Sequence, residues 1–146
     1  MTRESIRMTG EDRVAAGIRI VLGILFVMTG AMKLLVPSLG VAFGGQLAAA
    51  NIPLLEVNLF FVPLTEMGVG IAMLIGFYTR IATVLIFGIM IVGTYVHLVV
   101  NDPALFPLQP EQPIVPVVVM ILSIYVLSRG GGSGSADLRA SADAAP

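Results

Sequence analysis

Four long apolar runs constrain the fold of this chain more than any other feature, and they cover residues 14–36, 57–77, 81–100 and 114–128. A helix needs roughly 20 apolar residues to cross about 30 Å of hydrocarbon, and the first three runs reach that length. The fourth is shorter, but it has prolines at its start, which suit the first turn of a helix. Charged residues make up only 12% of the 146 residues, compared with about 25% in soluble domains. We therefore predict an all-α integral membrane protein, a bundle of four transmembrane helices surrounded by the lipid bilayer.

The other segments flank or connect these runs. Residues 1–13 form a polar leader, residues 14–128 form the membrane domain, and residues 129–146 are mostly Gly, Ser, Ala and Asp. That last composition predicts a disordered tail. Residues 37–56 are too weakly apolar to span a membrane, and we expect a short interfacial or re-entrant helix there. Residues 101–113 contain four prolines, which block continued helix and predict a loop.

Basic residues are distributed unevenly between these connections. The second connection and both ends of the chain carry arginines, whereas the first and third connections have no Lys or Arg and carry acids instead. The positive-inside rule then places the N- and C-termini on the cytoplasmic side, which an even number of spans allows. The arginines are Arg3, Arg7, Arg13, Arg80, Arg129 and Arg139, and the acids are Glu56, Asp102 and Glu111.

A weak internal similarity links the two halves of the membrane domain. Residues 23–29 (GILFVMT) resemble residues 88–94 (GIMIVGT), and a Val-Pro pair occurs at residues 62–63 and again at residues 115–116. Two readings stay open. The halves form a parallel repeat of two helical hairpins, as in some transporters, or the similarity arises by chance because apolar helices use few residue types.

Composition also excludes several classes of function. The chain has no cysteine and one histidine, which rules out disulfides, thiolate metal sites and bis-histidine haem ligation within one chain, so we expect no metal site. A net charge of −1 gives no basic patch for nucleic acid. No nucleophile–base set, P-loop or dinucleotide-binding motif is present.

Five ionisable residues lie within or at the ends of the apolar runs. A charged side chain at the centre of a membrane helix costs about 2.5–3.5 kcal/mol on insertion scales, so such residues tend to face the bundle interior and to pair. On a helical wheel several of them share a face with small residues that permit close helix packing. The ionisable residues are Arg19, Lys33, Glu66, Arg80 and His97, and the small residues are Gly23, Gly30 and Gly70.

These residues have a structural reading and a functional reading. Glu66 is either the ion-pair partner of Arg19 or Arg80, which we favour, or a proton-active carboxylate. Arg19 and Lys33 can extend to the membrane interfaces, and His97 is a typical interfacial hydrogen-bonding residue. In the functional reading, the interior faces of the first three helices form a polar pocket for a flat amphipathic ligand such as a quinone.

Three motifs make the chain similar to the DoxX family. Residues 30–34 (GAMKL) resemble its G-x-x-K signature, Glu66 with Gly68 and Gly70 resembles its E-x-G-x-G helix, and residues 76–82 (GFYTRIA) resemble its G-x-x-T-R-x-A turn. The turn is the most specific of the three. The similarity covers roughly residues 19–97, and the fourth apolar run agrees with the family only in hydropathy.

The resemblance implies a small four-helix protein of the prokaryotic inner membrane, with Lys33, Glu66, Thr79 and Arg80 at motif positions. Some members of that family are the membrane subunit of thiosulfate:quinone oxidoreductase, and others form complexes with soluble redox enzymes. Because this chain shows no cofactor ligands, we favour an accessory or anchoring subunit of a membrane oxidoreductase over a catalytic quinone-reducing subunit. Either role implies partner subunits or a homo-oligomer, no covalent cofactor, and quinone as the candidate ligand.

Overall fold

The computed structural model describes residues 7–110 and 112–143, and every regular element in those residues is helical. This confirms the all-α prediction for the described chain. The elements are α2 (Arg13–Leu35), α3 (Pro37–Ala49), α4 (Leu55–Ile75), α5 (Thr79–Val99), the 3₁₀ turn η1 (Pro103–Leu105), α6 (Ile114–Arg129) and α7 (Ala136–Asp143).

Three of the helices, α2, α4 and α5, are long and apolar enough to cross a membrane. The fourth apolar helix, α6, has only 16 residues. Three candidate spans are therefore established by length and hydropathy, and the fourth span stays a prediction.

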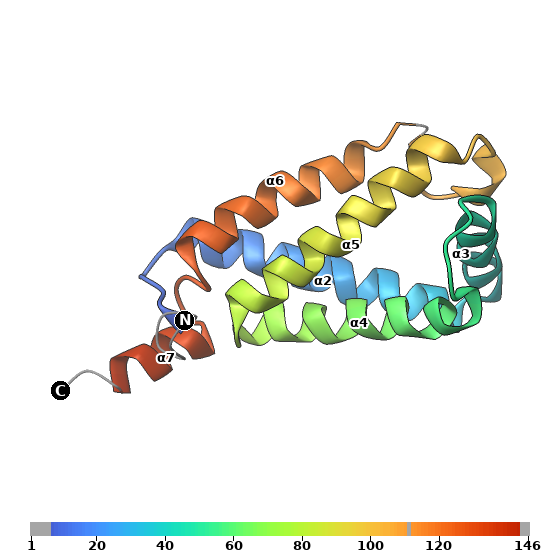
Figure 1. Cartoon of the computed structure of the whole chain (residues 1–146). Helices are drawn as coiled ribbons and strands as arrows, with labels where there is room; N and C mark the ends of the chain where they lie inside the picture. The colour runs from blue at the N-terminus through green and yellow to red at the C-terminus, as the bar shows by residue number, and fades with distance from the viewer. Residues whose placement is uncertain (1–6, 111, 144–146) are drawn as a thin grey trace.

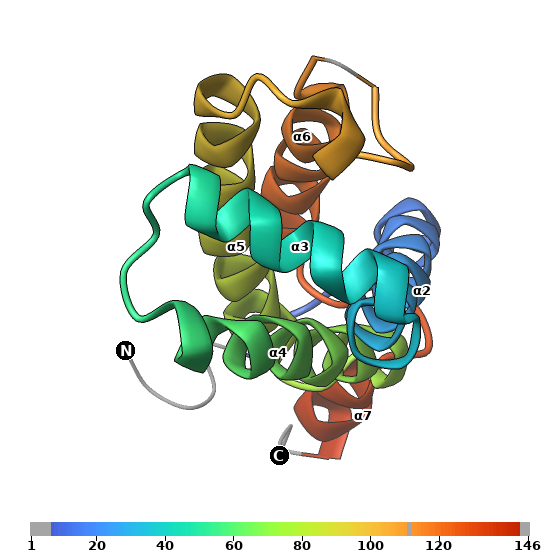
Figure 2. The same ribbon diagram turned by 90° about the vertical axis from the view of Figure 1, so that its right-hand side faces the viewer.

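Figure 1 shows the long helices running along one axis, with α3 lying across one end of the bundle and α7 at the opposite end. Figure 2, turned by 90°, shows α3 crossing over the ends of the long helices. Helix α2 packs on α4, and α5 packs on α6. The chain thus contains two helical hairpins, whose relation as a repeat stays a prediction.

Local sequence explains where the helices at the α3 end begin and end. Val36 precedes a proline, which disfavours helical backbone, and it is extended at φ −106° and ψ 104°. Pro37 then begins α3, where its missing N–H costs no hydrogen bond. The short helix that we predicted within residues 37–56 is therefore confirmed as α3.

The turn between α4 and α5 is tight because two residues adopt left-handed backbone. Gly76 ends α4 at φ 72°, and Tyr78 precedes α5 at φ 47°. Glycine adopts this conformation at no steric cost, whereas a tyrosine there is uncommon. The reversal brings the C-terminal end of α4 next to the N-terminal end of α5.

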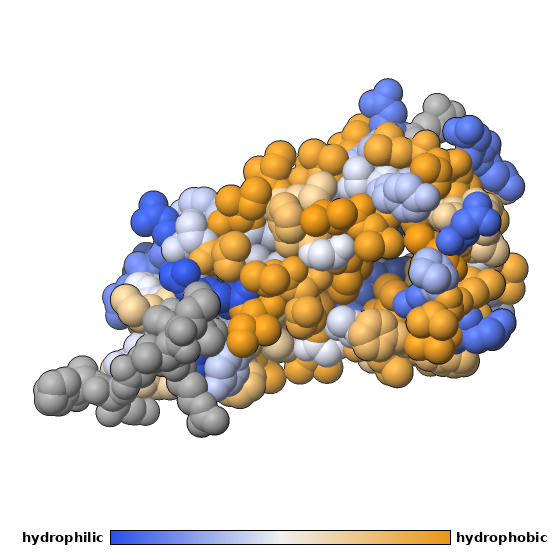
Figure 3. All heavy atoms as spheres, viewed as in Figure 1, coloured by the Kyte–Doolittle hydropathy of each residue, from blue (hydrophilic) through white to orange (hydrophobic). Residues whose placement is uncertain are grey.

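The core of the bundle lies between α2, α4, α5 and α6, and its largest fully buried apolar side chains are Leu22, Phe26, Met73, Ile86 and Val126. Many other large apolar side chains face outward, and Figure 3 shows that they cover most of the visible surface along the helices. A soluble monomer rarely exposes such a continuous apolar surface. The exposed faces are therefore suited to lipid, and the chain is a membrane protein.

The predicted packing glycines lie at the contact between α2 and α4. A Cβ atom at Gly70 would lie 2.7 Å from the backbone nitrogen of Val27, and one at Gly30 would lie 2.6 Å from the carbonyl oxygen of Pro63. A Cβ atom at Gly23 would lie 2.8 Å from the side chain of Leu74. Side chains at these positions would force the two helices apart.

The prediction of a disordered tail was wrong for residues 130–143. This segment contains α7, and Ser135 and Asp137 in it are fully buried. Gly and Ser are typical of linkers, but here they allow the chain to pack closely against residues 8–16 and the turn after α4. Residues 144–146 lie outside the described residues, as do Arg3 in the leader and Glu111 in the predicted third connection.

Candidate functional site

An ion pair between Lys33 of α2 and Glu66 of α4 is the central feature of the candidate site. Lys33 Nζ lies 2.5 Å from Glu66 Oε1, and it donates a hydrogen bond to that oxygen. The Glu66 side chain is only 3% exposed, and that of Lys33 is 23% exposed. The pair is thus shielded on the glutamate side and open to its surroundings on the lysine side.

A residue of α3 and the close contact between α2 and α4 complete the surroundings of this pair. The Lys33 ammonium lies 4.7 Å from the centroid of the Phe43 ring of α3, within range for a cation–π interaction. Gly30, one turn before Lys33, allows α4 to approach closely at Pro63 and Met67. Figure 3 shows hydrophilic atoms recessed between apolar ones where α3, α4 and α5 come together.

One oxygen of Glu66 is left without a partner. Oε2 is buried, and no group within residues 7–110 and 112–143 forms a hydrogen bond with it. A carboxylate has two acceptor oxygens, and burying one without a donor is costly. This orphaned oxygen is the strongest sign within the site that a further donor binds there.

His97 lies in the last turn of α5. Its ring centroid is 4.1 Å from that of Phe106, and its Nε2 is buried without a hydrogen-bond partner in the described chain. Val96 of α5 and Val100, the extended residue after α5, belong to a small apolar cluster with Phe106 and Ala50. The described residues show no hydrogen bond or ion pair that joins His97 to Lys33 or Glu66.

Arg19 and Arg80 are not partners of Glu66, which corrects our prediction. Arg19 is 3% exposed, and its guanidinium donates to the carbonyl oxygens of Met73, of Leu74 at 2.7 Å and of Gly131 at 2.8 Å. The last carbonyls of a helix have no partner within it and carry partial negative charge. Arg19 therefore fastens the C-terminal end of α4 to the segment before α7.

Arg80 lies in the first turn of α5, at the same end of the bundle. Its Nε donates to the carbonyl oxygen of Met8, and its Nη2 donates to that of Ser128, both at 3.3 Å. Within the described residues no carboxylate lies within 4.0 Å of it. Arg80 thus joins the N-terminal segment to the end of α6 and keeps an unpaired charge.

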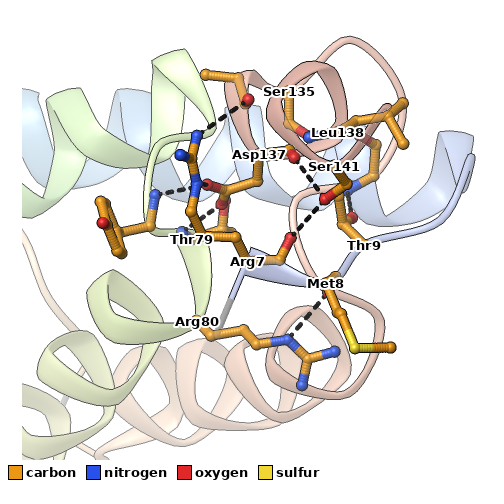
Figure 4. A network of polar contacts seen from close by, with 12 residues as sticks. Arg7, Met8, Thr9, Thr79, Arg80, Ser135, Asp137, Leu138 and Ser141 are labelled. Carbon is orange, nitrogen blue, oxygen red and sulfur yellow. Dashed lines mark hydrogen bonds and ion pairs between the residues drawn. The ribbon is translucent and has the colours of Figure 1, made fainter. Parts of the chain in front are cut away.

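The turn between α4 and α5 is held by a residue that the sequence did not point to. The carboxylate of Asp137 accepts hydrogen bonds from the backbone N–H groups of Tyr78 at 3.0 Å and Thr79 at 2.8 Å, and from Arg7 Nε at 2.9 Å (Figure 4). The backbone N–H of Asp137 in turn donates to the carbonyl of Gly76. Asp137 therefore caps α5, although it lies 58 residues after Thr79 in the sequence. Its negative charge accepts from N–H groups at the helix N-terminus, which have no partner within the helix.

Two residues of the site, Phe43 and Asp137, were not predicted from the sequence. Ser135 followed by Asp137 is a helix start signal, and Ser135 Oγ does accept from the Leu138 N–H at 3.1 Å. That signal could have shown α7. No local signal shows that Phe43 lies over Lys33, because only the crossing of α3 brings the two together.

The arrangement of motifs agrees with a family model. The DoxX model matches residues 14–98, which is more than half of the chain and covers α2 to α5. The chain belongs to the DoxX family. No curated protein and no solved structure gives a significant match.

The DoxX match places the Lys33–Glu66 pair and the Gly76–Arg80 turn inside the family region, whereas α6 and α7 lie outside it. The hydrogen bonds from Tyr78 and Thr79 to Asp137 therefore join the family region to a segment beyond the matched residues. Within the described residues, no group of three His, Cys, Asp or Glu side chains is placed to hold a metal ion.

Proposed function

We propose that this DoxX-family protein is an accessory, anchoring subunit of a membrane oxidoreductase complex in the prokaryotic inner membrane. The observation that supports it best is that each buried charge contacts another part of the bundle. Arg19 donates hydrogen bonds to backbone carbonyls, and Lys33 and Glu66 form an ion pair across the contact between α2 and α4. These groups hold the bundle together, which is what a subunit that anchors partners requires.

The proposal includes four spans with both ends in the cytoplasm. Its support is the charge asymmetry and the position of α7, whose Asp137 contacts Arg7 of the N-terminal segment. A chain without cysteine allows a direct test. Asp102→Cys should react with a membrane-impermeant maleimide in intact cells, and Arg139→Cys should react only after permeabilisation. The reverse pattern, or equal labelling of both, contradicts the topology.

The structural role of the ion pair is tested by single and double substitution. Glu66→Gln leaves the Lys33 charge without a partner, and breaking a buried pair typically costs about 3–5 kcal/mol. Lys33→Met combined with Glu66→Leu removes both charges and should restore most of the thermal stability in detergent. Glu56→Gln, at an exposed position in the first turn of α4, is the matched control and should melt like wild type.

Turnover separates the accessory role from catalysis. For an accessory subunit, the double variant should support quinone reduction by native membranes at nearly the wild-type rate, because its bundle is intact. A stable double variant that assembles with its partners but abolishes quinone reduction overturns the accessory role.

A catalytic quinone-reducing role, as in a thiosulfate:quinone oxidoreductase-like enzyme, is the second candidate. The unpartnered Glu66 Oε2 favours it, because a bound quinol hydroxyl would supply the missing donor. The purified protein should then bind a soluble quinone analogue, and both Lys33→Ala and Glu66→Ala should weaken that binding. Unchanged affinity in both variants excludes this pocket.

A further inference from the structure

A cavity that is largely open to the molecular surface lies at the α7 end, and the proposed function does not use it. Its volume is about 460 Å³, and four segments of the chain meet around it: the N-terminal segment, the start of α5, the end of α6, and α7. Its lining residues are Met8, Thr9, Gly10, Arg80, Arg129 and Ser141. Figure 4 shows the Arg80 side chain reaching Met8 on one side of this region, with Thr9 and Ser141 close by.

The cavity carries more positive than negative charge. Among the residues that the structure describes, Arg80 donates only to two backbone carbonyls, which leave its charge uncompensated. Arg129 Nε lies 3.7 Å from Asp12 Oδ2, and the Arg129 side chain is 61% exposed, so this ion pair is long and solvent-accessible. Hydrogen bonds from the backbone N–H groups of Ala15 and Val14 lower the pKa of Asp12, although its own desolvation opposes them. Asp12 thus stays ionised and offsets one of the two arginines.

The neutral lining suits an anion as well. Thr9 Oγ1 accepts a hydrogen bond from the Gly132 N–H at 2.9 Å, and its own hydroxyl hydrogen stays available to donate. Apart from its own chain neighbours, no atom of the described residues lies within 4 Å of where a Cβ at Gly10 would be, so the backbone there is open. Guanidinium groups bind phosphate through paired, charge-assisted hydrogen bonds, which two arginines at one cavity can provide.

Apolar surface begins directly beside the cavity. Val84 is one turn after Arg80 on α5 and is 55% exposed, and Tyr125 is one turn before Arg129 on α6, with its ring centroid 5.8 Å from the Arg129 guanidinium carbon. Because α5 packs on α6, these side chains belong to neighbouring helices. Met8, within the cavity lining itself, is 62% exposed. A ligand bound here would contact charge at one end and lipid-like surface at the other.

We propose that this cavity binds the phosphate of an anionic phospholipid headgroup between Arg80 and Arg129, with the acyl chains lying on the outer faces of α5 and α6. Basic pockets at the ends of membrane helices recognise such headgroups. The adjoining apolar surface favours a lipid over free phosphate, since a soluble anion would use only the arginines. This site is separate from the Lys33–Glu66 pair and does not depend on which side of the membrane it faces.

The test uses the full chain in nanodiscs of neutral phosphatidylcholine, with phosphatidylglycerol titrated in and bound lipid counted by native mass spectrometry. Each arginine near a membrane surface contributes about fivefold to binding of anionic lipid, so Arg80→Gln and Arg129→Gln together should weaken retention about thirtyfold. Arg139→Gln, which removes an exposed arginine of α7 outside the cavity lining, is the matched control and should bind like wild type.

Three outcomes decide the proposal. Selective retention of phosphatidylglycerol that falls in the double variant and not in the control supports it. Equal retention in wild type and double variant overturns it. Displacement of the lipid by about 10 mM inorganic phosphate at constant ionic strength overturns the lipid assignment in favour of a soluble anion. Because Arg80 also fastens two segments, thermal melting of the double variant in pure phosphatidylcholine is measured first. Arg129 has a mostly exposed side chain, so Arg129→Gln alone should weaken lipid retention about fivefold without affecting folding.

Discussion

Replacing Asp137 by alanine should release the C-terminal segment from the bundle. Its carboxylate accepts three hydrogen bonds, from the backbone N–H groups of Tyr78 and Thr79 and from Arg7 Nε, at 2.8–3.0 Å. The side chain is 2% exposed, so no water replaces it in the folded state. Asp137→Ala therefore leaves a cationic side chain and two helix-terminal N–H groups without their acceptor.

The structure allows an estimate of the cost. Removing one member of a buried ion pair typically costs about 3–5 kcal/mol, and hydrogen bonds to charged groups contribute about 1.5–3 kcal/mol each. Arg7 is partly exposed, so solvent screens its charge and the lower end of the range applies. About 3 kcal/mol corresponds to a more than 100-fold rise in the population with α7 detached.

Limited proteolysis measures that population directly. Trypsin cleaves after Arg129 only when the buried segment that follows it, Gly130–Gly132, leaves the bundle. When opening is fast relative to cleavage, the cleavage rate follows the population of the open form. We expect loss of residues 130–146, followed by mass spectrometry, to be at least about 100-fold faster in Asp137→Ala than in wild type.

One control and one refuting outcome make this result decisive. Asp102→Ala removes an exposed carboxylate at the opposite end of the bundle, which accepts one local hydrogen bond from the Ala104 N–H. It should leave cleavage after Arg129 unchanged. If Asp137→Ala and wild type are cleaved within about threefold of each other, the carboxylate does not hold the segment and the reasoning is refuted.

Two further predictions concern helix contacts and acid stability. Gly70→Ala should lower the free energy of unfolding by about 1–3 kcal/mol, because the new methyl group would meet the backbone of Val27. Gly68→Ala faces open space among the described residues, so in the same melting assay it should be neutral or stabilising by up to about 1 kcal/mol. Equal effects of the two would contradict the assigned contact. The pKa of Asp12 is lowered below its ordinary value of 3.8, so its contribution to stability is complete above that pH and is lost as pH falls through the folded-state pKa. Asp12→Asn keeps the helix cap without the titration, so its unfolding between pH 6 and 3 should lack that acid-sensitive component; identical pH profiles would show that Asp12 contributes none.

The sequence by itself determined the helices and their chemical character. Apolar runs with few charges predict membrane helices from hydropathy alone, and the residue before Pro37 marks a helix end because the proline ring disfavours helical backbone there. The face of α2 that carries Arg19, Gly23 and Gly30 also followed from sequence. Helical periodicity fixes which side chains share a face whatever that face meets, and all three are buried in the structure.

Only the tertiary structure decided which charged groups meet. From sequence, Glu66 had Arg19 and Arg80 as favoured partners, yet it pairs with Lys33 because α2 and α4 run past each other in the register that their glycines allow. Composition likewise predicted a disordered tail, since Gly and Ser bury little apolar surface of their own. That segment is ordered instead by Asp137 on the Tyr78–Thr79 backbone and by Arg19 on Gly131, contacts between residues more than 50 positions apart. Partners so distant leave no local pattern in the sequence, and only the packed bundle brings them together.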